Sequence, residues 1–355
     1  MDNLVQKHFS DIELSDPFFD NLRDNYPGFN DWFKKKATSG ARAYVYYNAG
    51  RIIDFLYLKV ENEPLTLIEG VQPAKRRLKI GTFKIEHRGT SRGERFIKRA
   101  LDEAIKEDCE EIYVTMFDDT EELKFLKKFF QKFGFIERGH IQHSNGRREC
   151  VLIRLLKTIS GDIIKDYPYV DLKEGDKYVL SIYPTYHTKL FSDSILKTEK
   201  FEILKDVSET NSIYKIYVCW MQGVSNLKKG DKLIIYRTSD QKGPALYRSV
   251  ASSLCTVYEV RTNHDFEGEE AFISYCNKYS VFNSSDLSKW YRADNTCYVI
   301  KMLYNVAFGK KVIRKDMIEL AKVPTNMYWG FFKLTDSQFN TISRLGEVDE
   351  RYIID

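Results

Sequence analysis

The sequence predicts a mixed α/β protein of two domains, in which a sheet covered by helices is followed by a smaller β-rich domain. Three observations support this prediction. The 355 residues suffice for two domains of ordinary size. Helix and strand patterns alternate over residues 1–160, whereas short strand patterns dominate residues 161–355. Aromatic residues make up 14% of the chain, which excludes a disordered protein.

In the first domain, residues 1–160, the apolar pattern changes between the periods of a helix and a strand. Aromatic residues at helical spacing over 16–37 predict a helical segment that Pro27-Gly28 breaks in two. Two further helices are expected over 94–106 and 120–133. Strands are expected over 41–48, 51–62, 77–86, 110–117, 135–142 and 149–156, the first two joined at Ala49-Gly50.

In the second domain, residues 161–355, short β-rich runs are separated by Gly, Asp, Asn and Lys. The runs cover 178–191, 212–222, 231–240, 245–262, 296–306 and 328–335. Helical patterns interrupt them at 269–279 and 314–320. A small β barrel with accessory helices is the simplest architecture for this pattern.

Composition restricts the compartment and the chemistry. The first residues lack the basic and apolar regions of a secretion signal, and no apolar run reaches the ~18 residues of a membrane span, so we expect a cytoplasmic protein. Six cysteines without a CxxC motif are typical of reduced thiols rather than of disulfides or zinc. His140 and His143 lack further ligands at suitable spacing, so no metal site is expected.

Charge is unevenly distributed, although the net charge is only +4. Residues 75–99 contain ten Lys or Arg against two acids, and residues 102–122 are strongly acidic. The basic run surrounds a loop with Arg88, Gly89, Thr90, Ser91, Arg92 and Gly93, which leads directly into a predicted helix. A helix N-terminus offers unpaired N–H groups and a positive dipole, so this loop is suited to hold a pyrophosphate.

The loop resembles the acetyl-CoA loop of the GNAT acetyltransferases, with Arg88 in the first position, Ser91 at the usual first glycine and Gly93 at the last. The flanking strands and helices match that family in order over about residues 15–156. The resemblance implies an N-acetyltransferase whose domain is a GNAT-type mixed sheet, and whose cosubstrate is acetyl-CoA. It implies cofactor contacts from Phe83, Lys84, Ile85, Arg88, Gly89, Thr90, Ser91, Arg92, Gly93 and Glu94.

The chain departs from the family at one chemically important position. Family members often carry a tyrosine that protonates the leaving thiolate, and Phe130 stands at that place here. Glu86, Tyr113 and Asp118 lie near the expected site and are candidate catalytic residues. Nothing in the sequence singles out one of them as the base.

The second domain resembles the PUA-like barrels that include ASCH and EVE domains, in its opening strand, in LKKGDKLIIYRTSD and in the closing YWGFFKLT. The Gly-x-Lys-x-x-Glu-x-Arg signature of ASCH members is missing. The resemblance implies binding of RNA or of a modified nucleic acid by base stacking. Candidate contacts are Tyr183, His187, Lys189, Arg237, Tyr247 and Arg248.

Two functions remain open at this point. The first is an acetyl-CoA-dependent N-acetyltransferase whose amine acceptor is linked to RNA, as tRNA or an RNA-bound protein, and is presented by the second domain. The second is a protein without catalytic activity that binds CoA and recognises RNA or modified DNA. The second domain has 27 basic and 26 acidic residues after Ser160, so we expect a local pocket rather than attraction by overall charge.

Overall fold

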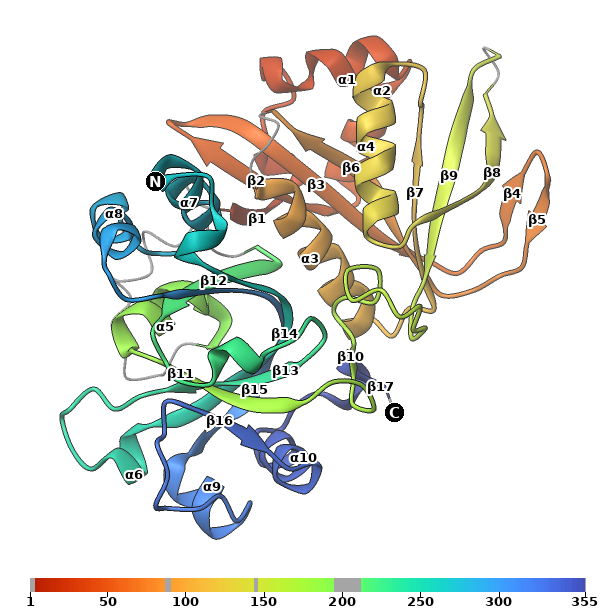
Figure 1. Cartoon of the computed structure of the whole chain (residues 1–355). Helices are drawn as coiled ribbons and strands as arrows, with labels where there is room; N and C mark the ends of the chain where they lie inside the picture. Colours follow the sequence, from red (N-terminus) through yellow and green to blue (C-terminus); the bar gives the residue numbers. More distant parts are fainter. Residues whose placement is uncertain (1–3, 87–90, 144–145, 195–211, 355) are drawn as a thin grey trace. The chain divides into compact units, whose positions relative to one another are not determined.

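The computed structural model describes residues 4–86, 91–143, 146–194 and 212–354. The chain divides into two compact units, Met1–Thr158 and Ile159–Asp355, and this division lies two residues before the domain boundary expected at 160/161. Each unit contains a sheet with helices packed against it (Figure 1). The protein is a mixed α/β protein, as the sequence predicts.

The first unit has a seven-stranded sheet in which β6 and β7 are parallel and all other neighbours are antiparallel. Its order is β1 (Leu4–His8), β2 (Arg42–Asn48), β3 (Arg51–Glu61), β6 (Arg77–Ile85), β7 (Glu111–Met116), β9 (Arg148–Leu155) and β8 (Ile136–Gln142). Every strand predicted for this unit is present. The strand β1 and the small hairpin of β4 (Leu65–Leu67) and β5 (Gly70–Gln72) were not expected, since such short segments carry little alternation.

The predicted turn between β2 and β3 is confirmed. Ala49 and Gly50 both have positive φ, at 47° and 82°. Two consecutive left-handed residues form the kind of turn whose twist matches that of a hairpin.

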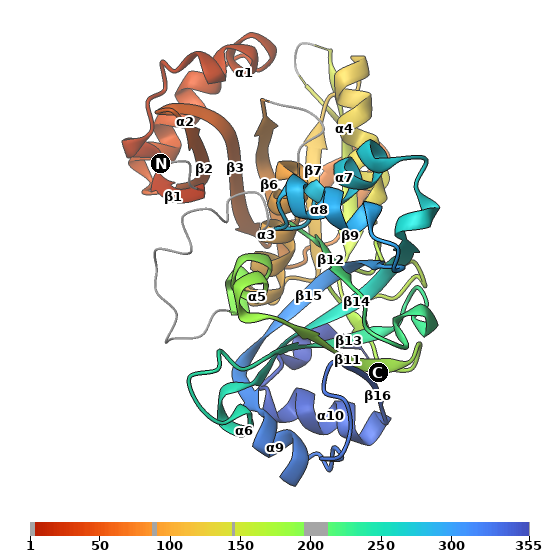
Figure 2. The same ribbon diagram turned by 60° about the vertical axis from the view of Figure 1, so that its left-hand side comes forward.

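Helices cover both faces of this sheet. On one face, α1 (Asp20–Asn25) and α2 (Phe29–Thr38) lie over β3, where Phe55 packs against Phe19. On the other face, α3 (Arg92–Lys106) and α4 (Glu121–Lys132) lie over β6, where Phe83 contacts Phe96 and Phe130. Figure 2 shows the sheet between the two pairs of helices.

The second unit has a six-stranded sheet in which β11 and β13 are parallel. Its order is β12 (Tyr214–Cys219), β15 (Tyr298–Ile313), β14 (Val250–Thr262), β13 (Lys232–Arg237), β11 (Lys177–Ile182) and β16 (Phe331–Leu334). The long pair β14 and β15 shifts register at three places, and such bulges bend a sheet. A short parallel pair, β10 (Val170–Asp171) and β17 (Ile353–Ile354), joins the two ends of this unit.

The helices of the second unit differ from the expectation. The predicted helices are present as α7 (Glu269–Asn277) and α9 (Arg314–Glu319). Two parts expected as β-rich are the helices α5 (Pro184–Leu190) and α6 (Ala245–Arg248), because a proline starts each of them. Two helices were missed, although each has an N-cap: α8 (Ser284–Arg292) after Asn283 and α10 (Asp336–Leu345) after Thr335.

All six cysteines are free and buried. Within the ranges that the structure describes, no helix has both the length and the apolar character required to cross a membrane.

Candidate functional site

The two parallel strands of the first unit pair over only part of their length. β6 and β7 pair from Arg77–Glu111 to Ile80–Val114, and the register between them ends there. Beyond that point β6 stays paired with β3, and β7 stays paired with β9. We call residues 81–85 of β6 and 115–116 of β7 the open end, because their pairing with each other has stopped.

A glycine marks the start of the open end. The pairs Tyr57–Thr82 and Leu58–Ile80 leave Gly81 as an extra residue on β6, which is a β-bulge. A Cβ at Gly81 would lie 2.7 Å from Cδ1 of Tyr57, so a side chain fits there only if the buried tyrosine moves. The bulge redirects β6 at the residue where its pairing with β7 ends. The sequence signal for it was a lone glycine inside a strand pattern, which our sequence analysis did not use.

Helix α3 begins beside the open end. Its N-cap is Ser91, and Arg92, Gly93 and Glu94 form its first turn. The candidates Arg88, Gly89 and Thr90 lie outside the described residues. The exposed N–H groups and the dipole of this helix start are suited to an anion.

Gly93 has a different role from the one expected. A Cβ there would meet the ring of Phe129 at 3.1 Å and Cδ1 of Ile85 at 3.5 Å. The missing side chain therefore allows α3 to pack closely against α4 and β6. A contact of Gly93 with an anion would therefore use its backbone N–H group.

Arg92 interacts with the protein itself. Its Nη1 lies 3.4 Å from Oδ2 of Asp54, and both Arg92 and Arg95 lie over the ring of Tyr46. Burial raises the pKa of Asp54 to about 7, and the positive charges of Arg92 and Arg95 oppose that rise. Two cations thus surround one carboxyl group that is easily neutralised, which leaves the start of α3 positively charged.

The basic run is partly neutralised by the acidic run that follows it. Strand β6 and helix α3 lie next to the segment around β7, which brings opposite charges together. The ion pairs are Lys75–Glu111, Arg76–Glu107, Arg77–Glu111 and Lys98–Asp102. These four cations are therefore engaged within the fold, and Arg92 and Arg95 lie in the first turn of α3 and just after it.

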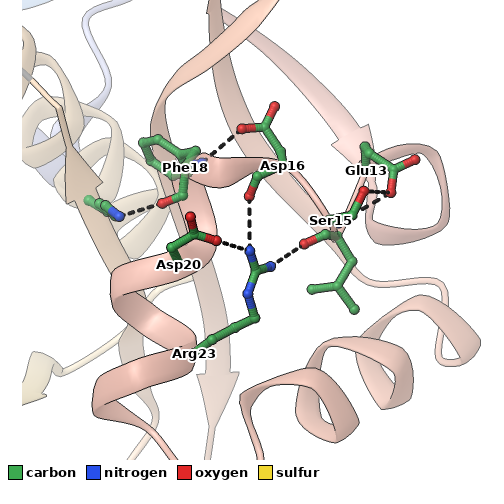
Figure 3. Close-up of polar contacts among 8 residues, drawn as sticks. Glu13, Ser15, Asp16, Phe18, Asp20 and Arg23 are labelled. Carbon is green, nitrogen blue, oxygen red and sulfur yellow. Dashed lines mark hydrogen bonds and ion pairs between the residues drawn. The ribbon is translucent and has the colours of Figure 1, made fainter.

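Phe83, Lys84 and Ile85 form the open end of β6, but their side chains point to partners within the fold. Phe83 packs on α3 and α4. The Lys84 ammonium donates a hydrogen bond to the carbonyl of Phe18, lies over its ring, and has its pKa lowered by burial. Figure 3 shows this contact beside Arg23, which donates to the carbonyl of Leu14 at 2.5 Å and pairs with Asp20. Any contact of these three residues with acetyl-CoA would therefore use the backbone.

The three catalytic candidates are placed differently. Glu86 is exposed directly after β6, and its N–H donates to the carbonyl of Ile53. Tyr113 lies in the paired part of β7, buried, and its hydroxyl donates to Glu61. Burial raises the pKa of Tyr113, and the bond to Glu61 adds to the rise. A buried phenol held by a carboxylate is not suited to act as a base.

Asp118 and Phe130 complete this group. Asp118 follows β7 at the open end and pairs with Lys127 at 2.6 Å. Lys127 also pairs with Glu137 at 2.8 Å. Phe130 is fully buried against Phe83 and Phe135, so it belongs to the core.

The candidates in the second unit are not gathered on one exposed face. Tyr183 and Tyr247 are exposed, at 64% and 56%. His187 is fully buried, with Nε2 2.7 Å from Oγ of Ser252, and Arg237 is buried as well. His187 was a candidate nucleic-acid contact, but α5 turns its side chain inward, away from any base on the surface.

The basic partners expected for stacking also have other contacts. Arg248 forms an ion pair with Asp240. The cation over the ring of Tyr247 is Lys315 of α9, at 5.8 Å. Lys189 is half-buried on α5. Among the described residues, no group of three or more His, Cys, Asp or Glu is arranged to hold a metal ion.

No family model matches the sequence, and no curated protein matches it either. Solved structures do match. Ard1 from Thermoplasma volcanium is 14% identical with a TM-score of 0.34, and the match covers 44% of this chain and 99% of that one. A GNAT family acetyltransferase from Elizabethkingia anophelis with acetyl-CoA bound is 12% identical with a TM-score of 0.29, over 44% and 100% of the two chains.

A match of the other kind is ASCH from Zymomonas mobilis, 7% identical with a TM-score of 0.34, over 48% of this chain and 95% of that one. Solved structures similar to this chain thus include both GNAT acetyltransferases and ASCH proteins, the two kinds of domain that the sequence resembles.

Proposed function

We propose that the first unit binds acetyl-CoA and transfers its acetyl group to an amine. The observation that supports this most is the open end of β6 and β7, next to the start of α3. Unpaired strand edges offer hydrogen bonds to an amide-containing chain such as pantetheine. A helix start with Arg92 and Arg95 beside it offers charge and N–H groups to phosphates.

The reaction requires little from the protein beyond orientation and proton transfer. A neutral amine attacks the thioester carbonyl, and the thiolate of CoA leaves. Phe130 cannot protonate that thiolate. Since a thiol has a pKa of about 8.5, the thiolate is a good leaving group without an acid.

We also propose that the acceptor is linked to RNA, as tRNA or an RNA-bound protein, that the second unit contacts it, and that the protein acts in the cytoplasm. Support for an RNA contact comes from the exposed Tyr183 and Tyr247, the latter under Lys315. An exposed ring beside a cation is a surface on which a base can stack. The alternative is a protein that binds CoA without turnover, and measuring CoA release with amines distinguishes the two.

The first test measures acetyl-CoA binding by calorimetry on the full chain. We expect wild-type protein to bind acetyl-CoA more tightly than acetylpantetheine, which lacks the phosphates. Arg92→Glu reverses a charge in the first turn of α3 and should abolish binding. Gly93→Ala is the matched control, because its Cβ needs only a small movement of the Phe129 ring edge. It should keep most of the affinity.

Two outcomes would contradict this proposal. Equal affinity for acetyl-CoA and acetylpantetheine would remove the role of the helix start in holding phosphates. Unchanged affinity in Arg92→Glu would do the same. Circular dichroism of both variants checks that a loss of binding is not a loss of fold.

A further inference from the structure

The carboxyl end of β7 gathers side chains from three separate segments. Tyr26 directly follows α1, Phe117 directly follows β7, His143 follows β8, and Glu149 lies on β9. The Phe117 ring centroid is 5.2 Å from that of Tyr26 and 5.7 Å from that of His143. None of these four residues was a candidate from the sequence as a catalytic group.

His143 and Glu149 form the polar part of this cluster. Nε2 of His143 lies 3.1 Å from Oε2 of Glu149, whose side chain is nearly buried. The His143 side chain is 39% exposed, whereas Nε2 is buried and forms no hydrogen bond, so its contact with Glu149 is a close approach of two ionisable groups. The exposure therefore belongs to the other atoms of the ring. A carboxylate this close to one ring nitrogen favours the ring orientation that keeps the two groups in contact.

The neighbouring charged groups leave this pair in place. Tyr26 also forms a side-chain hydrogen bond with Glu149, and its pKa is raised, by burial first and then by the negative charge of Glu149. Arg147 lies over the Phe117 ring at 3.7 Å, pairs with Asp119 at 2.8 Å and donates to the carbonyl of Asn25. Because Arg147 is already paired with Asp119, it does not compete with His143 for Glu149.

The pair lies at the open end, on the face opposite α3. Cys150 pairs with Met116, so Glu149 stands one residue past the last strand residue of β7. Successive side chains of a strand point to opposite faces of the sheet, so Glu149 shares a face with Val151 and not with Cys150. Val151 packs against Tyr113. The Tyr113 hydroxyl donates a hydrogen bond to Glu61 of β3, and Glu61 shares a face with Phe55. Because α1 and α2 cover Phe55, Glu149 lies on the face of the sheet that carries these two helices.

We propose that His143, oriented by Glu149, is the general base that deprotonates the acceptor amine. This assignment rests on the transferase function proposed above. An acetyl group held at the open end from the α3 side would meet an acceptor that approaches from the α1 and α2 side, beside Phe117 and Tyr26.

The proton balance is simple. Neutral His143 takes one proton from the acceptor ammonium at Nδ1, while Nε2 stays buried beside Glu149. The neutral amine then forms the C–N bond to the acetyl carbon as the C–S bond breaks. The second nitrogen proton goes to the leaving thiolate, and His143 returns its proton to water. The products are the acetylated amine, CoA thiol and one proton.

The experiment measures CoA thiol release by the full-length protein over a range of pH. The acceptors are spermidine, a short peptide with a free N-terminus, and aminoacyl-tRNA. We expect His143→Gln to lower kcat by about 10²- to 10³-fold with an unchanged KM for acetyl-CoA, and to remove the fall of the rate in acid. Glu149→Gln should lower kcat less and leave the KM for acetyl-CoA unchanged, because the imidazole remains but loses the neighbouring carboxylate that orients it.

His140→Gln is the matched control. His140 lies three residues before His143 on β8 and pairs with Glu69 and Glu137, away from the cluster. It should leave kcat and the pH profile unchanged. All three variants should bind acetyl-CoA like wild type, as measured by calorimetry.

The outcomes separate this proposal from the transferase function. If an amine is acetylated and His143→Gln keeps its rate and its acid limb, the base assignment is wrong although the transferase stands. If His143→Gln and His140→Gln lose equal activity, the effect is structural and the assignment is again wrong. If acetyl-CoA binds and no amine of the panel turns over, the base and the transferase are both rejected.

Discussion

The main sheet of each unit contains one pair of neighbouring parallel strands, and the two pairs behave differently. In the second unit, β11 and β13 stay paired over their whole length, from Lys177–Lys232 to Ile182–Arg237. In the first unit, β6 and β7 stop pairing at Ile80–Val114. Parallel pairing by itself therefore does not create an opening at the carboxyl end.

The difference has a local cause. β13 is an uninterrupted run of buried residues, with Leu233, Ile234 and Ile235 at its centre. β6 carries Gly81 at its centre, and the bulge there bends the strand. A run that is buried on both faces keeps its hydrogen bonds because leaving them unpaired costs free energy. A strand that gives them up needs another partner, which makes the open end the better candidate for a ligand.

The sequence predicts the elements of the first unit better than the details of its site. Period and turn residues such as Ala49-Gly50 are local, so every predicted strand of that unit was found. The roles of Arg92 and Lys84 were not local. Their partners, Asp54 and the carbonyl of Phe18, are far away in sequence.

Distance along the chain also explains the residues that were missed. His143 was considered only as a metal ligand, because the pattern does not show that Glu149 faces it across the β8–β9 hairpin. His187 was expected on the surface, because a run rich in Tyr and Thr conceals a helix that starts at Pro184. A sequence shows which groups exist, whereas register and helix direction decide which of them meet.

The largest expected effect compares packing in the two parallel pairs. Ile234→Ala in β13 removes a fully buried side chain from a core that includes Val179 and Trp329, and should lower the free energy of unfolding by about 3 kcal/mol. Ile85→Ala at the open end removes a half-buried side chain and should cost about 1 kcal/mol. Urea unfolding followed by circular dichroism measures both. Equal losses would mean that the open end is packed as tightly as the fully paired strands β11 and β13.

The second comparison uses one buried titratable group near the carboxyl end of each parallel pair, β6–β7 and β11–β13. Asp54 pairs with Ile85 of β6, and burial raises its pKa to about 7. His187 follows β11, and burial, with Arg237 and Lys311 nearby, lowers its pKa to about 3. Each group prefers its neutral form in the fold, so the two act on stability in opposite directions.

The signs follow from proton binding. Between pH 3.8 and 7 the folded protein holds the Asp54 proton longer than the unfolded chain does, so this group lowers stability as pH rises. Between pH 3 and 6.5 the unfolded chain holds the His187 proton, so this group lowers stability as pH falls. From pH 6 to 4.5 each effect is worth about 2 kcal/mol.

Variants resolve the two contributions. On lowering the pH from 6 to 4.5, Asp54→Asn should lose about 2 kcal/mol more stability than wild type, and His187→Gln about 2 kcal/mol less. Urea unfolding at several pH values measures both differences. Parallel curves for the three proteins would show that neither group is held neutral, and the contrast between the two ends would then rest on strand pairing alone.

The smallest expected effect on stability concerns Tyr183, at the carboxyl end of the paired strands β11 and β13. Tyr183 directly follows β11 and is 64% exposed, while its carbonyl accepts hydrogen bonds from the N–H groups of Tyr186 and His187. Tyr183→Ala keeps those backbone bonds and should change the free energy of unfolding by less than about 0.5 kcal/mol.

If a base stacks on this ring, the same substitution should weaken binding of a labelled single-stranded RNA by about 1 to 3 kcal/mol in fluorescence anisotropy. Leu320→Ala, which removes an exposed side chain of comparable exposure without a ring, is the control and should leave the affinity unchanged. If the RNA affinity does not respond to Tyr183→Ala, the surface at the end of β11 has no role in binding RNA. The acceptor would then have to be sought among proteins and small amines that reach the open end directly.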